Sequence, residues 1–203
     1  MSRVALVAAV VLGFAAAGTV AVAEEAPQNS RAAGKLLTEA QKACQAKNFT
    51  ECIAKAKEAS GVPGKNAYDG YIINQMLMAA YAGQQNQAET ANYAELIVDS
   101  PYAPASLKAQ LIKFLMTNAY QNKAYEKAIA YAEKVRAGGD NSEDVAVLIA
   151  QSYYLLGKYK EAMAGMDAII ARAEQSGHKP SEKGLNVVWS LSLIHISEPT
   201  RPY

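Results

Sequence analysis

The fold prediction starts from ten residues, YYLLGKYKEA, which run from Tyr153 to Ala162. They indicate the end of one helix, a tight turn at Gly157 and the start of a second helix. Glycine suits a left-handed turn position because it has no Cβ atom to clash with the backbone. Tyr159 and Ala162 are three residues apart, so they share the face of the second helix that meets the first. The small side chain of Ala162 lets the two helices approach closely.

The same arrangement occurs earlier in the chain, where YQNKAYEKA runs from Tyr120 to Ala128. Apolar periodicity and turn residues predict eight helices, over residues 33–46, 50–60, 66–82, 88–98, 105–121, 125–136, 142–156 and 159–175. They form four antiparallel pairs. The residues that open the second helix of each pair are spaced 38, 38 and 34 residues apart, namely Phe49, Gln87, Tyr125 and Tyr159. A period of this length is typical of a solenoid, in which each helix pair covers the apolar face of its neighbour.

Composition agrees with an all-helical chain and argues against nucleic acid as a partner. Alanine is abundant, and glycine and proline are scarce inside the predicted helices. The chain has 20 Lys and Arg residues against 19 Asp and Glu residues, and the two signs are interspersed. A surface that tracks phosphates needs a basic patch or stripe, and the sequence contains none.

The first 23 residues have the pattern of a secretory signal peptide. A basic start at Met1–Arg3 precedes an apolar run that ends in Ala21-Val22-Ala23, a small-residue cleavage site. A membrane anchor is the alternative for about 20 apolar residues, but glycine and alanine make this run weakly hydrophobic. We therefore expect cleavage after Ala23, a periplasmic bacterial protein with no membrane span after cleavage, and a short disordered leader over residues 24–32.

The far end of the chain has a different origin. The eleven residues LSLIHISEPTR, from Leu191 to Arg201, are the in-frame translation of a common transposon-type sequencing adaptor. A match of that length in register is too specific to be chance, so we exclude residues 191–203 from the fold. Residues 177–190 then read as the start of a further helix, with Ser181 as its cap, which the adaptor truncates. We expect the natural protein to continue past Ser190.

The period and the residue types resemble the tetratricopeptide repeat. The fourth pair fits best, and its matching residues are Ile149, Ala150, Tyr153, Gly157, Tyr159, Ala162 and Ile169. The third pair also fits, through Leu115, Met116, Ala119, Tyr125, Ala128 and Val135. The first two pairs are degenerate, since Gln87 and Thr90 replace an aromatic residue and an alanine, and Glu39 replaces a leucine. The resemblance implies an all-α, right-handed α-solenoid over residues 33–176, with Tyr159 packed in its core.

The resemblance also implies a peptide-binding groove, because the first helix of each pair lines the inner surface in this family. The family's inward positions select Gln41, Gln75, Lys113, Thr117, Tyr120, Gln151 and Tyr154. These residues make a groove of glutamines and tyrosines without the basic clamp that some family members use for a peptide carboxylate. Tyrosine rings and glutamine amides suit contact with an extended peptide or a glycan. The alternative is a solvated concave surface.

No catalytic constellation is present in the sequence. His178 is the only histidine before the adaptor, and no phosphate-binding or nucleophile-elbow motif occurs. We therefore expect no cofactor and no metal, and a scaffold that binds a protein or peptide partner in the cell envelope without catalytic activity of its own. The alternative is the N-terminal solenoid arm of a cell-envelope enzyme whose catalytic domain is missing; sequencing the natural locus past Ser190 distinguishes the two.

Cys44 and Cys52 are the one pair of residues whose chemistry suggests a specific bond, a disulfide. They fall near the end and the start of the first two predicted helices, where an antiparallel turn can bring their Cα atoms within the roughly 5.5 Å that a disulfide needs. An exported compartment would let the disulfide form and persist. The alternative is two small buried hydrophobic residues, with Cys52 at the position where the repeat has alanine.

Overall fold

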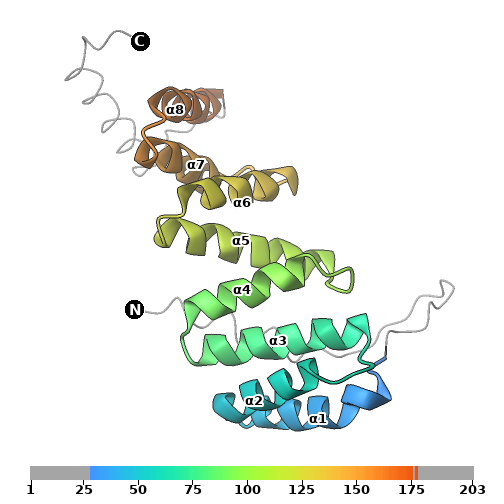
Figure 1. Cartoon of the computed structure of the whole chain (residues 1–203). Coiled ribbons are helices and arrows are strands. Elements are labelled where there is room, and N and C mark those ends of the chain that lie inside the picture. Colours follow the sequence, from blue (N-terminus) through green and yellow to red (C-terminus); the bar gives the residue numbers. More distant parts are fainter. Residues whose placement is uncertain (1–27, 176, 178–203) are drawn as a thin grey trace, which may run out of the picture. The chain divides into compact units, whose positions relative to one another are not determined.

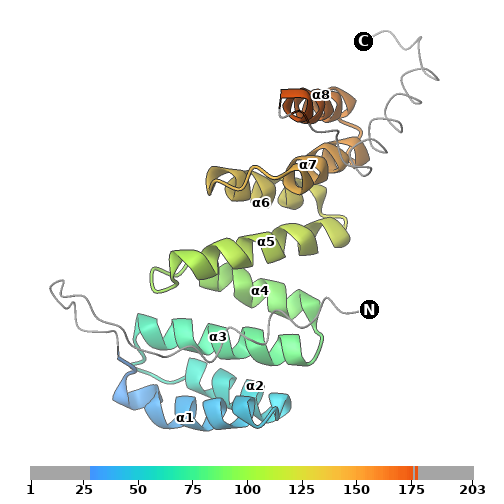
Figure 2. The same cartoon turned by 180° about the vertical axis from the view of Figure 1, so that it is seen from behind.

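A computed structural model describes residues 28–175 and 177 of this chain. These residues form eight helices and no strand, which confirms the all-α prediction (Figures 1 and 2). The helices are α1 (Arg31–Gln45), α2 (Phe49–Ser60), α3 (Ala67–Gly83), α4 (Gln87–Val98), α5 (Ala105–Gln121), α6 (Tyr125–Ala137), α7 (Glu143–Leu155) and α8 (Tyr159–Gln175). The observed bounds lie within two residues of those that the sequence predicts.

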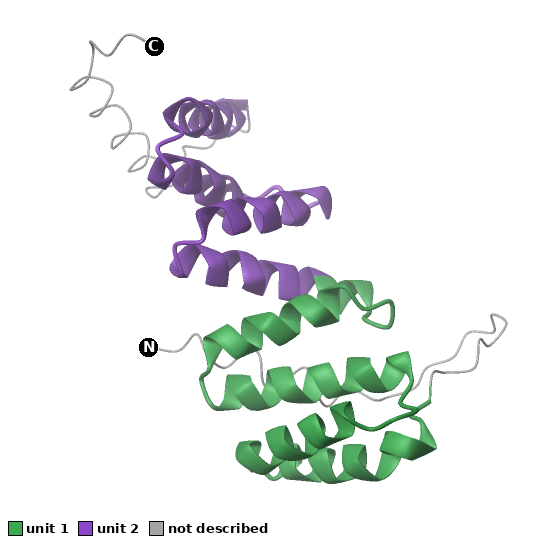
Figure 3. Cartoon of the chain, viewed as in Figure 1, with its two compact units in different colours: residues 1–108 green, residues 109–203 purple. Residues whose placement is uncertain are grey.

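The chain divides into two compact units, residues 1–108 and 109–203, with the boundary inside α5 (Figure 3). In the first unit α2 packs on α1, α3 on α2 and α4 on α3. In the second unit α7 packs on α6 and α8 on α7. Packing of each helix against the next one in the sequence is the arrangement of a helical repeat solenoid.

Every helix pair is joined by the same turn. Lys47, Gln85, Lys123 and Gly157 occupy equivalent positions and have positive φ angles of 59°, 60°, 60° and 74°. The residue after each one donates its backbone N–H to the fifth carbonyl before it, as Lys158 does to Tyr153 at 2.9 Å. This is the hydrogen bond of a Schellman-type helix end. Glycine thus occupies the turn position only in the fourth pair. In the other three pairs a residue with a long polar side chain adopts the same positive φ angle.

Small or apolar residues of the second helices form the seams between helices. The third residue after each opening position is buried, as Cys52, Thr90, Ala128 and Ala162. The seventh residue beyond each of these is buried too, as Ala59, Ile97, Val135 and Ile169. The opening residue Tyr159 itself is 45% exposed, so the prediction that it packs in the core was wrong.

The first helix begins inside the segment that we expected to be a leader. α1 starts at Arg31, and the Ser30 hydroxyl accepts a hydrogen bond from the backbone N–H of Ala33 at 3.3 Å. The Ser30 backbone N–H in turn donates to Asp69 in α3 at 3.0 Å. Residues 28–32 are therefore tied to the repeat region.

The predictions for residues 1–23 and 191–203, and for the helix that Ser181 opens, fall outside the described residues. Within the described part, none of the helices has both the length and the apolar character needed to cross a membrane.

Candidate functional site

The seven predicted groove residues divide between the two units. Gln41 and Gln75 lie in the first unit, and five lie in the second on α5 and α7, namely Lys113, Thr117, Tyr120, Gln151 and Tyr154. Gln41 is exposed on α1, and the Gln75 amide donates to the Tyr71 hydroxyl at 2.8 Å. We take the five residues of the second unit as the candidate site and call them the α5–α7 face.

Tyr120 and Gln151 join the two helices of this face. The Tyr120 hydroxyl donates a hydrogen bond to Gln151 Oε1 at 3.1 Å. Both side chains are half-buried, so each is held in place while part of it stays accessible to solvent. Burial, followed by the neighbouring Tyr125, raises the pKa of Tyr120. The hydroxyl therefore stays protonated, and remains a donor, at neutral pH.

Each tyrosine of the face contacts the tyrosine that opens the following helix. The Tyr120 and Tyr125 rings lie 5.8 Å apart in an edge arrangement, and the Tyr154 and Tyr159 rings lie 5.7 Å apart and tilted. Such aromatic pairs contribute about 0.5–1.5 kcal/mol beyond their burial. Tyr159 is 45% exposed and packs its ring on Tyr154 at the surface.

Lys113 is neutralised by an acid that the sequence did not point to. Its Nζ atom lies 2.6 Å from Asp140 Oδ2, and Asp140 Oδ1 accepts a hydrogen bond from the Ser142 backbone N–H at 3.0 Å. The hydrogen bond from Lys113 is the main reason that the pKa of Asp140 falls to about 2. Thr117 is exposed, and its hydroxyl donates to the Lys113 carbonyl at 3.2 Å. The face therefore presents no unpaired cation from Lys113.

A second group of aromatic side chains lies in the first unit. The rings of Tyr68, Tyr71 and Tyr102 are 5.4 to 6.2 Å from one another, centroid to centroid. Tyr71 is buried and accepts the hydrogen bond from Gln75. Sequence reasoning placed Tyr68 and Tyr71 on one helix, but it did not bring Tyr102 to them from the turn after α4.

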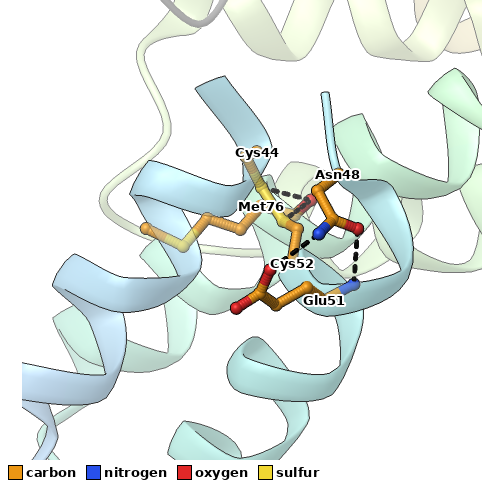
Figure 4. The surroundings of a disulfide bond; sticks show 5 residues. All are labelled: Cys44, Asn48, Glu51, Cys52 and Met76. Atoms are coloured by element: carbon orange, nitrogen blue, oxygen red, sulfur yellow. Dashed lines mark hydrogen bonds between the residues drawn. A yellow bond between two sulfur atoms is a disulfide. The ribbon is translucent and has the colours of Figure 1, made fainter. Parts of the chain in front are cut away.

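The structure pairs Cys44 and Cys52 in a disulfide across the turn between α1 and α2 (Figure 4). Their Cα atoms are 5.1 Å apart, and the carbonyl oxygen of Met76 in α3 lies about 4 Å from each sulfur, at 4.0 and 3.9 Å. Asn48 caps α2 beside the disulfide, where its side chain accepts from the Glu51 backbone N–H and donates to the Glu51 carboxylate. Whether the disulfide forms in the isolated protein stays a prediction.

No group of three or more metal-ligating side chains gathers within the described residues. Residues 121–176 match the family model described as Anaphase-promoting complex, cyclosome, subunit 3. This segment resembles the tetratricopeptide repeat, and the match supports that resemblance. The segment runs from the last residue of α5 through α6, α7 and α8, and so includes Gln151, Tyr154 and the best-preserved turn at Gly157. Neither the curated proteins nor the solved structures gave a match to the chain.

Proposed function

We propose that this chain is an exported, periplasmic scaffold that binds an extended peptide segment of a protein partner on the α5–α7 face, with no catalytic activity of its own. The tetratricopeptide-like repeat supports a role in protein interaction. The observation that carries the proposal is the hydrogen bond between Tyr120 and Gln151, because it holds two half-buried side chains from separate helices on one surface.

The chemistry of the face favours an uncharged stretch of peptide. Tyrosine offers a large apolar ring at a low entropic cost, and is enriched among the residues that contribute most to binding energy. The Gln151 oxygen is held by Tyr120, which orients its amide nitrogen as a donor for a peptide carbonyl. Lys113 is paired with Asp140, so it does not select a partner by a terminal carboxylate. Side chains already held in place lose less entropy when a ligand binds.

A library of random peptides displayed on phage, panned against the immobilised protein, tests the proposal. We expect peptides that bind the native chain to lose at least about tenfold in affinity when Tyr120→Ala and Tyr154→Ala are combined, since truncating a central aromatic residue costs roughly 1.4 kcal/mol or more. The two substitutions also remove the ring contacts with Tyr125 and Tyr159, so the melting temperature should fall, and affinity is compared at a temperature where both proteins are folded. Tyr102→Ala is the matched control, because it removes an exposed tyrosine of the first unit. Equal capture of the selected peptides by the double variant would remove this assignment.

A further inference from the structure

The two cysteines of the disulfide between α1 and α2 differ in their access to solvent. Cys44 lies in the last turn of α1 and is half-buried. Cys52 lies in α2, where it has no exposed surface and packs in a cluster with Ala43 and Ala80. Figure 4 shows the pair at the turn that joins the two helices. A reagent in solution therefore reaches this disulfide from the side of Cys44.

The turn and the helix pair are held by contacts other than the disulfide. The backbone N–H of Asn48 donates to the Ala43 carbonyl at 2.9 Å, and that of Lys47 donates to the Cys44 carbonyl at 3.0 Å. The two helices also share a buried cluster one or more turns away from the sulfurs, which includes Leu37, Ala40, Ala56 and Ala59. We therefore expect α1 and α2 to stay packed when the bond between the sulfurs is broken.

The reduced form fits the same backbone. The carbonyl oxygen of Met76 lies 3.9 Å from Cys52 Sγ and 4.0 Å from Cys44 Sγ, within reach of a weak S–H donor. The third and fourth pairs have Ala128 and Ala162 buried at the position of Cys52, so a small residue without a cross-link packs well there. Both oxidation states are thus compatible with the packing around α3.

The positions of the cysteines in their helices favour one direction of exchange. Cys52 lies at the end of the first turn of α2, near the positive end of the helix dipole, and Cys44 lies near the negative end of α1. In thiol–disulfide exchange the sulfur that forms the more stable thiolate leaves faster. Burial opposes a lasting charge on Cys52, so the departing thiolate takes up a proton. Attack at Cys44 combines the accessible sulfur with the better-placed leaving group.

We propose that Cys44–Cys52 is an exchangeable disulfide whose substrate class is a dithiol, and that Cys44 is the sulfur attacked. One thiolate of the dithiol bonds to Cys44 Sγ, the bond between the cysteines breaks, and its electron pair leaves on Cys52 Sγ, which takes a proton from solvent. The second thiol then attacks the first sulfur of the dithiol and releases Cys44 as a thiol. Two electrons pass to the cysteine pair, and the dithiol becomes a disulfide. This site is separate from the α5–α7 face.

Reduction of the folded chain tests whether the disulfide is exchangeable. The probe is dithiothreitol, a small dithiol, added to the oxidised full chain without denaturant. We expect the intact mass to rise by two hydrogens while far-ultraviolet circular dichroism keeps its helical signal. A disulfide that is reduced only after urea unfolds the chain would overturn the proposal. So would loss of the helical signal on reduction, or free thiols on both cysteines after mild oxidation.

The order in which the two thiols react tests the site of attack. Trypsin cuts after Lys47, so Cys44 and Cys52 fall in separate peptides. After reduction of the folded chain, a limiting amount of iodoacetamide should label Cys44 at least about tenfold faster than Cys52, because a buried thiol reacts only when the structure opens. In denaturant the two rates should become similar, which is the control. Equal labelling in the folded chain, or faster labelling of Cys52, would contradict attack at Cys44.

Variants with a single cysteine provide an independent measurement. Cys52→Ala leaves Cys44 alone, and Cys44→Ala is the matched variant. With oxidised glutathione as the probe, folded Cys52→Ala should gain the mass of one glutathione by forming a mixed disulfide on Cys44. Folded Cys44→Ala should stay unmodified over the same time, because its thiol is buried. Modification of the two variants at the same rate would show that both sulfurs are accessible, and would overturn the assignment of Cys44.

Discussion

The residue that precedes the second helix is asparagine in the first two pairs and alanine in the third. Asn48 and Asn86 each accept a hydrogen bond from a backbone N–H three residues later. Ala124 has nearly the same backbone, with φ −84° and ψ 64° against −82° and 86° at Asn86, but it has no side chain to accept one. The first N–H groups of a helix lack partners within the helix, so a capping oxygen is stabilising.

We therefore predict that Ala124→Asn stabilises the protein. The gain expected for an asparagine in place of alanine at an N-cap is about 0.5–2 kcal/mol. Urea unfolding followed by circular dichroism measures it as a higher midpoint at an unchanged slope. Asn86→Ala is the reverse control and should lose a similar amount. A variant at residue 124 no more stable than the native chain would show that its backbone does not present the side chain as Asn86 does.

At the scale of whole helices, one buried carboxylate ties α1 to α3. Asp69 has no exposed surface, and it accepts hydrogen bonds from the backbone N–H groups of Ser30 at 3.0 Å and Asn66 at 2.8 Å. Asn66 accepts in return from the Asp69 backbone N–H, which completes a capping box. Burial opposes the charged form of Asp69, but these hydrogen bonds outweigh burial, and the pKa of Asp69 is lowered.

Replacing this carboxylate should be costly because two backbone donors lose their acceptor. We expect Asp69→Ala to reduce the free energy of unfolding by roughly 2–4 kcal/mol. Asp167→Ala, which removes an exposed aspartate from α8, should change the free energy of unfolding by less than about 0.5 kcal/mol. Denaturant titrations of the two variants compare them directly, and equal effects would contradict the role given to Asp69.

The same carboxylate should make stability depend on pH in a defined direction. A folded pKa below the unfolded value of about 3.9 means that the contribution is fully present above that value. It is lost as the pH falls through the lower, folded pKa. We expect acid unfolding of the native chain to be steeper in this range than that of Asp69→Asn, whose side chain does not ionise. Circular dichroism between neutral and acidic pH provides the comparison.

For the molecule as a whole, export from the cytoplasm would favour the disulfide between Cys44 and Cys52. A disulfide across the short turn between α1 and α2 would stabilise the folded chain by about 2–3 kcal/mol in the loop-entropy account. Disulfides persist in oxidising compartments such as the periplasm and are rare in reducing ones. The pairing of Cys44 with Cys52 is therefore consistent with the proposed location.

Intact-mass spectrometry of protein recovered from the periplasmic fraction of a bacterial host tests both points at once. The expected species begins at Glu24 and is two hydrogens lighter than the reduced chain. Reduction under denaturing conditions should add those two hydrogens, and Cys44→Ser should prevent the change. Protein found only in the cytoplasmic fraction would reject export, while free thiols on both cysteines of exported protein would reject the disulfide alone.

Some features of this protein follow from local sequence. The eight helices and their pairing follow from apolar periodicity, from small residues such as Ala128 and Ala162, and from the turn at Gly157. These signals work because helix propensity, capping and turn geometry depend on residues only a few positions apart. The repeat then predicts which helices are neighbours, since each pair buries the face of the next.

Only the tertiary structure decided how particular side chains are used. The bond from Tyr120 to Gln151, the pairing of Lys113 with Asp140 and the contact of Ser30 with Asp69 join residues 27 to 39 positions apart. Tyr159 lies at the surface, where its ring contacts that of Tyr154. A repeat pattern specifies the backbone position of each residue, but the partner of a polar or aromatic side chain depends on what the neighbouring helix places opposite it. That choice is made by packing in three dimensions, which a local pattern does not encode.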